Sequence, residues 1–198
     1  MDAGFAAVPK PALVPVGTGS PEVESQRQAT MKAVAASAVS GKATTATLPC
    51  WEDTSFRRDG LIKYVSMEWN YPGDRQYELR ARSSWVGPWE LFTVCRDPFS
   101  KLTTIKSQSN NKYVSVEMGY QGTIYAMLRA RTSEDSLIDS WELFYTEFEP
   151  REGYCGQIRA KSNGLFVAVE EGYTGESQGM LRARTPRSQI GTWETFCY

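Results

Sequence analysis

The chain has 198 residues, 41% of them hydrophobic and 23% charged, a composition typical of one globular domain with room for a tail. Its 22 Lys and Arg residues are balanced by 23 Asp and Glu residues, so there is no basic field to attract phosphates and no nucleic-acid partner is predicted. The longest weakly polar stretch, residues 31–46, is too short and too polar to span a bilayer, so membrane insertion is not predicted either.

The first part of the chain, residues 1–46, is rich in Ala, Pro, Ser, Thr and Val and shows no regular alternation, which predicts a disordered N-terminal tail. Asp2 stands where a secretory signal would be basic, and prolines interrupt the only apolar run, so a cytoplasmic location is expected. Residues 27–47 contain no acidic residue and faintly resemble a transit peptide. An organellar or secreted location therefore stays open.

The rest of the chain, residues 47–198, contains three copies of one pattern, at about 47–97, 98–149 and 150–198. In each copy a run of the type Lys-Tyr-Val-Ser-x-Glu is followed by Leu-Arg-Ala-Arg and then by Trp-Glu-x-Phe. These runs begin at residues 63, 79 and 89, then at 112, 128 and 141, and more loosely at 165, 181 and 193. The tryptophans recur at an interval of 52 residues in both cases, 89 to 141 and 141 to 193.

Apolar and polar residues alternate within each copy, as they do in half-buried strands. In the first copy Val65 and Met67 share one face, while Glu68 lies on the other. The leucine and alanine of Leu-Arg-Ala-Arg face inward and its two arginines outward, and the small alanine suits a narrow barrel. Trp-Glu-x-Phe forms the fourth strand, and a first strand precedes the others, as at residues 102–106 and 156–160.

These features predict an all-β fold, a β-trefoil with three repeats of four strands related by pseudo-threefold symmetry. The strand count matches a closed barrel capped by three hairpins, whereas a propeller would need more blades and a solenoid has no such closure. Closure requires the last strand to meet the first one near Cys50, since an unpaired strand would leave an open edge.

Cofactor, metal and catalytic chemistry are not predicted. The chain has no histidine, which removes the usual general base and most metal sites, and its cysteines lack the C-x-x-C spacing of a zinc site. The cysteines suit either buried small residues or one or two disulfides; they are Cys50, Cys95, Cys155 and Cys197. Recurring carboxylates beside recurring arginines are interpreted as structural ion pairs, namely Glu90 with Arg82, Glu142 with Arg131 and Glu194 with Arg184.

A candidate binding constellation is the pattern Glu-x-x-Tyr-x-Gly, which follows the second strand of each repeat. A tyrosine ring offers an apolar face to a sugar, a carboxylate accepts hydrogen bonds from hydroxyls, and a glycine lets the backbone approach. Alternatively, the tyrosines pack across the hairpin and the glycines only permit positive φ in the turn. The predicted ligand-binding residues are Glu68, Tyr71, Gly73, Glu117, Tyr120, Gly122, Glu170, Tyr173 and Gly175.

Further surface candidates are two tryptophans without counterparts in the other repeats, Trp69 and Trp85, and a basic group made of Arg57, Arg58 and Arg75. Unmatched aromatic residues on loops are a common feature of partner sites.

The threefold motif resembles the fascin-like, actin-crosslinking superfamily of β-trefoils over about three-quarters of the chain. The clearest match is Leu79 to Phe92, including Gly87-Pro88-Trp89-Glu90. The resemblance implies actin bundling, usually by several trefoils in tandem, or a glycan-associated accessory role. Only one trefoil is predicted here, and the Gln-x-Trp motif of ricin-type sugar-binding trefoils is absent.

The function we expect is that of a non-enzymatic binding module, multivalent, lectin-like and specific for carbohydrate. The alternative is a fascin-type protein that binds and crosslinks actin filaments. The sequence leaves the oligomeric state open.

Overall fold

The structure is a computed structural model that describes residues 48–146 and 153–198. These residues are all β: they form thirteen strands, joined by loops and short 3₁₀ turns. Within them, no helix is long and apolar enough to cross a membrane. The tail predicted at residues 1–46 lies outside the described residues.

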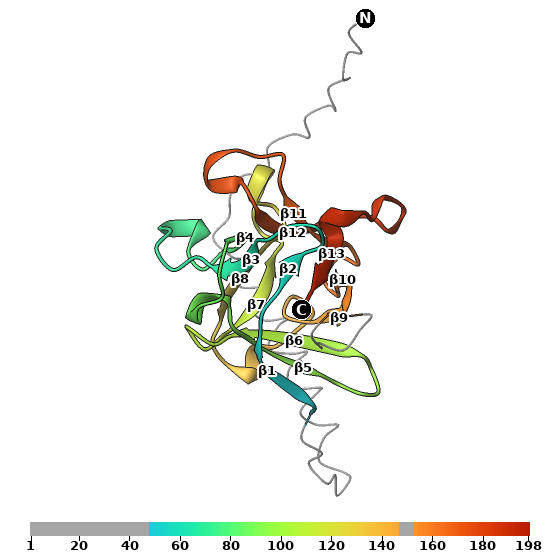
Figure 1. Cartoon of the computed structure of the whole chain (residues 1–198). Coiled ribbons are helices and arrows are strands. Elements are labelled where there is room, and N and C mark those ends of the chain that lie inside the picture. The colour runs from blue at the N-terminus through green and yellow to red at the C-terminus, as the bar shows by residue number, and fades with distance from the viewer. Residues whose placement is uncertain (1–47, 147–152) are drawn as a thin grey trace, which may run out of the picture. The chain divides into compact units, whose positions relative to one another are not determined.

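The strands follow one another along the three segments that the sequence predicts as repeats (Figure 1). The first segment contains β1 (Cys50–Thr54), β2 (Arg57–Arg58), β3 (Tyr64–Met67), β4 (Leu79–Ser83) and β5 (Phe92–Arg96). The second contains β6 (Leu102–Ser107), β7 (Lys112–Glu117), β8 (Met127–Thr132) and β9 (Phe144–Thr146). The third contains β10 (Cys155–Ala160), β11 (Phe166–Glu170), β12 (Met180–Thr185) and β13 (Thr195–Cys197).

Strand pairing closes the sheet on itself. The pairings run from β1 through β5, β6, β9, β10 and β13 to β2, and all of them are antiparallel. Because β1 and β2 are consecutive pieces of the first strand, this ring is complete. Three further hairpins, β3–β4, β7–β8 and β11–β12, lie outside the ring, and their strands β4 and β8 both pair with β12.

Closure occurs at a different place from the one predicted. The last strand meets Arg57 and Arg58 of β2, whereas the residues around Cys50 pair with β5 of the same segment. The first strand is interrupted between β1 and β2, and its register already shifts beyond Trp51, where Asp53 takes a positive φ of 52°. This bend gives β1 a different partner from β2.

The core confirms the predicted inward face of the strands. In the first segment Val65, Met67 and Leu79 are fully buried, and the small Ala81 lies beside them. The phenylalanine that ends each Trp-Glu-x-Phe run is completely buried as well. The matching core residues of the other segments are Val114, Val116, Leu128, Ala130, Phe144, Val167, Val169, Leu181, Ala183 and Phe196.

The structure also corrects the predicted fourth strand. Trp89 and Glu90 lie in the 3₁₀ turn η2 (Pro88–Glu90), and β5 begins only at Phe92. The buried carboxylate of Glu90 accepts a hydrogen bond from the Gly87 N–H at 2.8 Å, which bends the chain before the strand. Glu142 and Glu194 do the same for Asp139 and Gly191, at 3.1 and 2.8 Å.

All four cysteines are paired. Cys50 and Cys95 face each other across β1 and β5, and Cys155 and Cys197 across β10 and β13, with Cα atoms 4.1 and 4.0 Å apart. Of the two possibilities that the sequence left open, the structure shows two disulfides.

Candidate functional site

Three buried arginines connect the hairpins of different segments. The residues Arg80, Arg129 and Arg182 are only 6 to 7% exposed, although the sequence predicted them on the outer face. We call them the bridging arginines. Their face of each hairpin is covered by a turn from another segment, so the guanidinium groups lie inside the protein rather than in water.

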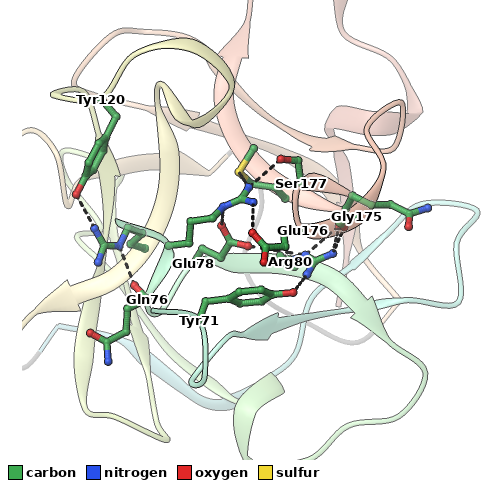
Figure 2. Close-up of polar contacts among 12 residues, drawn as sticks. Tyr71, Gln76, Glu78, Arg80, Tyr120, Gly175, Glu176 and Ser177 are labelled. Atoms are coloured by element: carbon green, nitrogen blue, oxygen red, sulfur yellow. Dashed lines mark hydrogen bonds and ion pairs between the residues drawn. The ribbon is translucent and has the colours of Figure 1, made fainter. Parts of the chain in front are cut away.

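Each bridging arginine donates hydrogen bonds to backbone carbonyls of such a turn. Nε of Arg80 donates to the carbonyl of Gln178 in the third segment at 2.9 Å. A second guanidinium nitrogen of Arg80 donates to the carbonyl of Gly175 at 3.1 Å (Figure 2). Arg129 reaches Gln76 of the first segment at 2.8 Å, and Arg182 reaches Tyr125 of the second, also at 2.8 Å. The arginine of the first segment therefore donates to the third segment, that of the third to the second, and that of the second to the first.

The tyrosines of the predicted binding sites contact these same arginines. Arg80 donates to the hydroxyl of Tyr71, and Arg129 donates to that of Tyr120 at 2.9 Å (Figure 2). Arg182 lies 3.5 Å from the hydroxyl of Tyr173. Partial burial raises the pKa of Tyr120, whose hydroxyl also donates to Asp74. The rings are half-buried, and the end of each ring is held by protein.

The glutamates of the predicted sites are buried, contrary to their predicted place on the outer face. Glu68, Glu117 and Glu170 are 1 to 4% exposed and form ion pairs with Arg82, Arg131 and Arg184. These pairs replace the predicted ones with Glu90, Glu142 and Glu194, whose carboxylates cap turns instead. Burial raises the pKa of Glu117 despite its arginine partner. A ligand at these turns would meet the outer N–H groups of an arginine rather than a carboxylate.

The glycines of the pattern begin the 3₁₀ turns η1 (Gly73–Arg75), η3 (Gly122–Ile124) and η5 (Gly175–Ser177). Their φ angles are 63°, 66° and 64°, in the left-handed region that favours glycine. A Cβ atom built on any of them would meet nothing within 4 Å. The turns are therefore open to solvent, as both interpretations of the pattern require.

An aromatic groove lies beside the first of these turns, and the sequence pattern found only part of it. One hollow of about 230 Å³ is lined by Glu68, Trp69, Asn70, Tyr71, Arg82 and Trp89. A second, of about 510 Å³, is lined by Ser66, Arg82, Ser83, Ser84, Trp85, Pro88, Trp89 and Glu90. The tryptophans are well exposed: Trp69 44%, Trp85 66% and Trp89 45%. We use the name aromatic groove for these two hollows together.

Local contacts orient the indoles of this groove. The Trp69 ring meets the Tyr77 ring edge to face, with centroids 5.5 Å apart. The Trp85 ring lies against Gly87, where an added Cβ would stand only 2.4 Å from a ring carbon. The hydroxyl of Ser83 donates to the Trp85 carbonyl at 2.6 Å. The Trp69 ring and the Trp85 segment therefore have defined neighbours within the protein.

Loss of a bridging arginine is expected to destabilise the fold. Arg182→Met keeps the aliphatic stem but removes the donors to the carbonyls of Gly122 and Tyr125. We expect the free energy of unfolding to fall by about 2 kcal/mol, because partly buried, charge-assisted hydrogen bonds between two segments are lost. Urea unfolding measures this, with Arg57→Met at an exposed position as the control. Equal midpoints for the two variants would contradict the bridging role.

Comparison with known proteins identifies the fold and no more. No protein-family model matches the sequence, and no curated protein matches it. Among solved structures, the designed threefold-symmetric protein ThreeFoil superposes with a TM-score of 0.55 at 12% identity, covering 73% of this chain and 95% of that one. An SDF2-like protein from Arabidopsis thaliana gives 0.55 at 8% identity, covering 76% and 94%. A mosquitocidal holotoxin gives 0.57 at 9%, covering 78% of this chain but 17% of the toxin.

These neighbours have β-trefoil-type folds, so this chain has an all-β fold of the trefoil type. At such low identities the likeness says nothing of ligand or activity. Membership of the fascin-like branch stays a prediction.

Proposed function

We propose that this protein is a non-enzymatic carbohydrate-binding module, built as a β-trefoil of three four-stranded repeats with pseudo-threefold symmetry. The cyclic order of the bridging arginines supports the symmetry, since the arginine of each segment donates to backbone carbonyls of another segment in the same way. Corresponding backbone bonds support it too: the N–H groups of Ala81, Ala130 and Ala183 bond the carbonyls of Gly179, Tyr77 and Ala126 at 2.7, 2.9 and 2.9 Å.

The aromatic groove carries the proposal for carbohydrate. Sugar rings present C–H faces that stack on indoles, and their hydroxyls need a few well-placed hydrogen-bonding groups. The groove combines three exposed tryptophans with Arg82, Asn70 and Ser84. The half-buried rings of Tyr71, Tyr120 and Tyr173 would add weaker contacts at the three turns, which is how the module would bind multivalently.

A catalytic role is not part of the proposal. The chain has no histidine, and the carboxylates nearest the groove, those of Glu68 and Glu90, are buried and bonded to Arg82 and to the Gly87 N–H. These buried and hydrogen-bonded carboxylates support the choice of a binding role over a catalytic one.

A glycan array tests the proposal with the wild-type protein, Trp89→Ala and Trp193→Ala. Trp193 is a matched control, because it occupies the corresponding turn of the third segment and is 41% exposed, close to the 45% of Trp89. We expect Trp89→Ala to weaken binding about 10-fold or more, from loss of one stacking surface, and Trp193→Ala to leave most of it. Absence of glycan binding by the wild type would overturn the proposal.

Actin-filament binding, the alternative that the family resemblance implies, is tested by cosedimentation of the same proteins with filamentous actin at low and at physiological salt. Pelleting that survives physiological salt and is lost in Trp89→Ala would favour actin over carbohydrate. Bundling by a single trefoil would also need two actin sites or a dimer.

We further propose that the protein works in an oxidising compartment rather than in the cytoplasm. Structural disulfides are rare in reducing compartments, and this domain forms two. Thiol titration of protein taken directly from its native source checks this: protection of all four cysteines supports it, and four free thiols would count against it.

A further inference from the structure

We infer that the aromatic groove binds a linear, uncharged oligosaccharide of at least two sugar rings, and that it is the one strong site of the described part of the chain. The inference rests on the proposed carbohydrate-binding function and adds to it the length, the charge class and the stoichiometry of the ligand.

The two hollows are neighbours, because both are lined by Trp89 and Arg82. The larger hollow alone falls within the range of about 300–1,000 Å³ that is usual for small-ligand sites. Trp69 and Tyr71 line one hollow, Trp85 lines the other, and Trp89 stands between them. Aromatic rings in succession suit successive sugar units of one chain, whereas a single sugar would use only one hollow.

The charged groups that line the groove already have partners within the protein. Arg82 is half-exposed and forms an ion pair with the buried carboxylate of Glu68, which raises the pKa of the arginine further. The other acidic residue of the lining, Glu90, is buried and accepts the Gly87 N–H. The remaining polar groups are the Asn70 amide and the hydroxyls of Ser66, Ser83 and Ser84. Such a lining has a formal charge of −1, carried by buried carboxylates that already have partners, and so it suits neutral hydroxyl-rich rings better than anionic ones.

The other segments lack two of the three tryptophans that line this groove, Trp69 and Trp85. Alignment on the buried glutamates places Met118 and Glu171 where the first segment has Trp69. Glu171 is engaged by Arg58, whose Nε lies 2.6 Å from its carboxylate. Trp85 belongs to a connection that has no tryptophan in either of the other segments. A single extended site is therefore expected in the described part of the chain.

Isothermal titration calorimetry tests the inference with cellotetraose, chitotetraose and mannotetraose, their monosaccharides, and tetragalacturonate as the charged arm. We expect at least one neutral tetrasaccharide to occupy one strong site per protein, with any binding at the turns of the other segments much weaker. It should bind about 10-fold or more tightly than its monosaccharide, because it covers an additional indole. Its affinity should change little between low and high salt, since no net charge is neutralised.

Two glycine variants distinguish an effect on the groove from a general effect on the fold. Gly87→Ala should displace the Trp85 ring and weaken tetrasaccharide binding several-fold, whereas Gly191→Ala should not, because its Cβ meets only Glu194 at 3.7 Å. Trp85→Ala should reproduce the effect of Gly87→Ala, and thermal unfolding shows whether each variant is folded.

Failure of this inference is distinguishable from failure of the proposed function. Three equivalent sites per protein, equal affinities for monosaccharide and tetrasaccharide, or preference for tetragalacturonate would overturn the single neutral groove while carbohydrate binding stands. Absence of binding to any sugar, here and on the array, would overturn both.

Discussion

Reduction of both disulfides is expected to lower the free energy of unfolding by about 4 to 8 kcal/mol. The bonds join cysteines that are 45 and 42 residues apart in the sequence. In the chain-entropy account, closing a loop of such length removes about 4 kcal/mol of conformational freedom from the unfolded state. The upper value applies if the two bonds act independently. Urea unfolding with and without reductant, followed by tryptophan fluorescence, measures the difference.

The two disulfides are expected to differ in how much each contributes to the stability of the whole domain. Cys155–Cys197 holds β13, which carries the buried Phe196 and closes the sheet against β2, so its loss should destabilise the whole domain. Cys50–Cys95 holds β1, most of which is exposed, so its loss should chiefly free that strand locally. We therefore expect a larger fall in unfolding midpoint for Cys155→Ser/Cys197→Ser than for Cys50→Ser/Cys95→Ser. The reverse order would contradict this assignment.

Sequence alternation predicted the inward face of the strands well, because its period is set by backbone geometry alone. Val65 and Met67, and with them Leu79 and Ala81, are buried as expected. Alternation does not reveal whether the opposite face is covered. Arg80 stands on that face, yet it is buried, because a turn about a hundred residues away in the sequence packs over it. Such a contact depends on the assembled fold and leaves no local signal.

The place of closure shows a similar limit. The pattern located a first strand around residues 47–56, but not the interruption that gives Cys50 and Arg57 different partners. A positive φ at an aspartate, as at Asp53, is not readable from composition, since aspartate occupies many conformations.

Part of the candidate site was predictable. Trp69 and Trp85 stood out because neither has a counterpart in the other repeats, and both line the aromatic groove. Trp89 did not stand out, because its threefold recurrence suggested a structural strand residue. The structure places it in an exposed turn, where the neighbouring glutamate caps the turn and the tryptophan ring is left at the surface. The groove therefore combines one recurring tryptophan with two that occur in the first segment alone.

A departure from recurrence also identifies Glu78, which stands where the other segments have Met127 and Met180, directly before the leucine of Leu-Arg-Ala-Arg. Its carboxyl is fully buried and accepts a hydrogen bond from Arg75 at 3.0 Å, with Arg80 at 3.9 Å (Figure 2). Burial outweighs the two arginines and raises the pKa of Glu78 to about 7.

A raised carboxyl pKa makes the folded state the better proton binder between about pH 4.5 and pH 7. Unfolding then releases a proton, so the Glu78 contribution to stability falls as pH rises through this window. Above pH 7 the Glu78 carboxyl is ionised in both the folded and the unfolded state. Burial of its charge then lowers the free energy of unfolding by the full amount, about 3 kcal/mol.

Glu78→Met should therefore stabilise the protein by about 3 kcal/mol at alkaline pH, with the gain shrinking as pH falls toward 5. Arg75 would keep partners after the substitution, since it also bonds Ser177 at 2.9 Å and lies 3.4 Å from Glu176. Urea unfolding of variant and wild type across this pH range measures the difference, in which contributions from other groups cancel. Glu52→Gln, at an exposed position, controls for removal of a carboxylate. A gain that does not change with pH would show that Glu78 is not the titrating group.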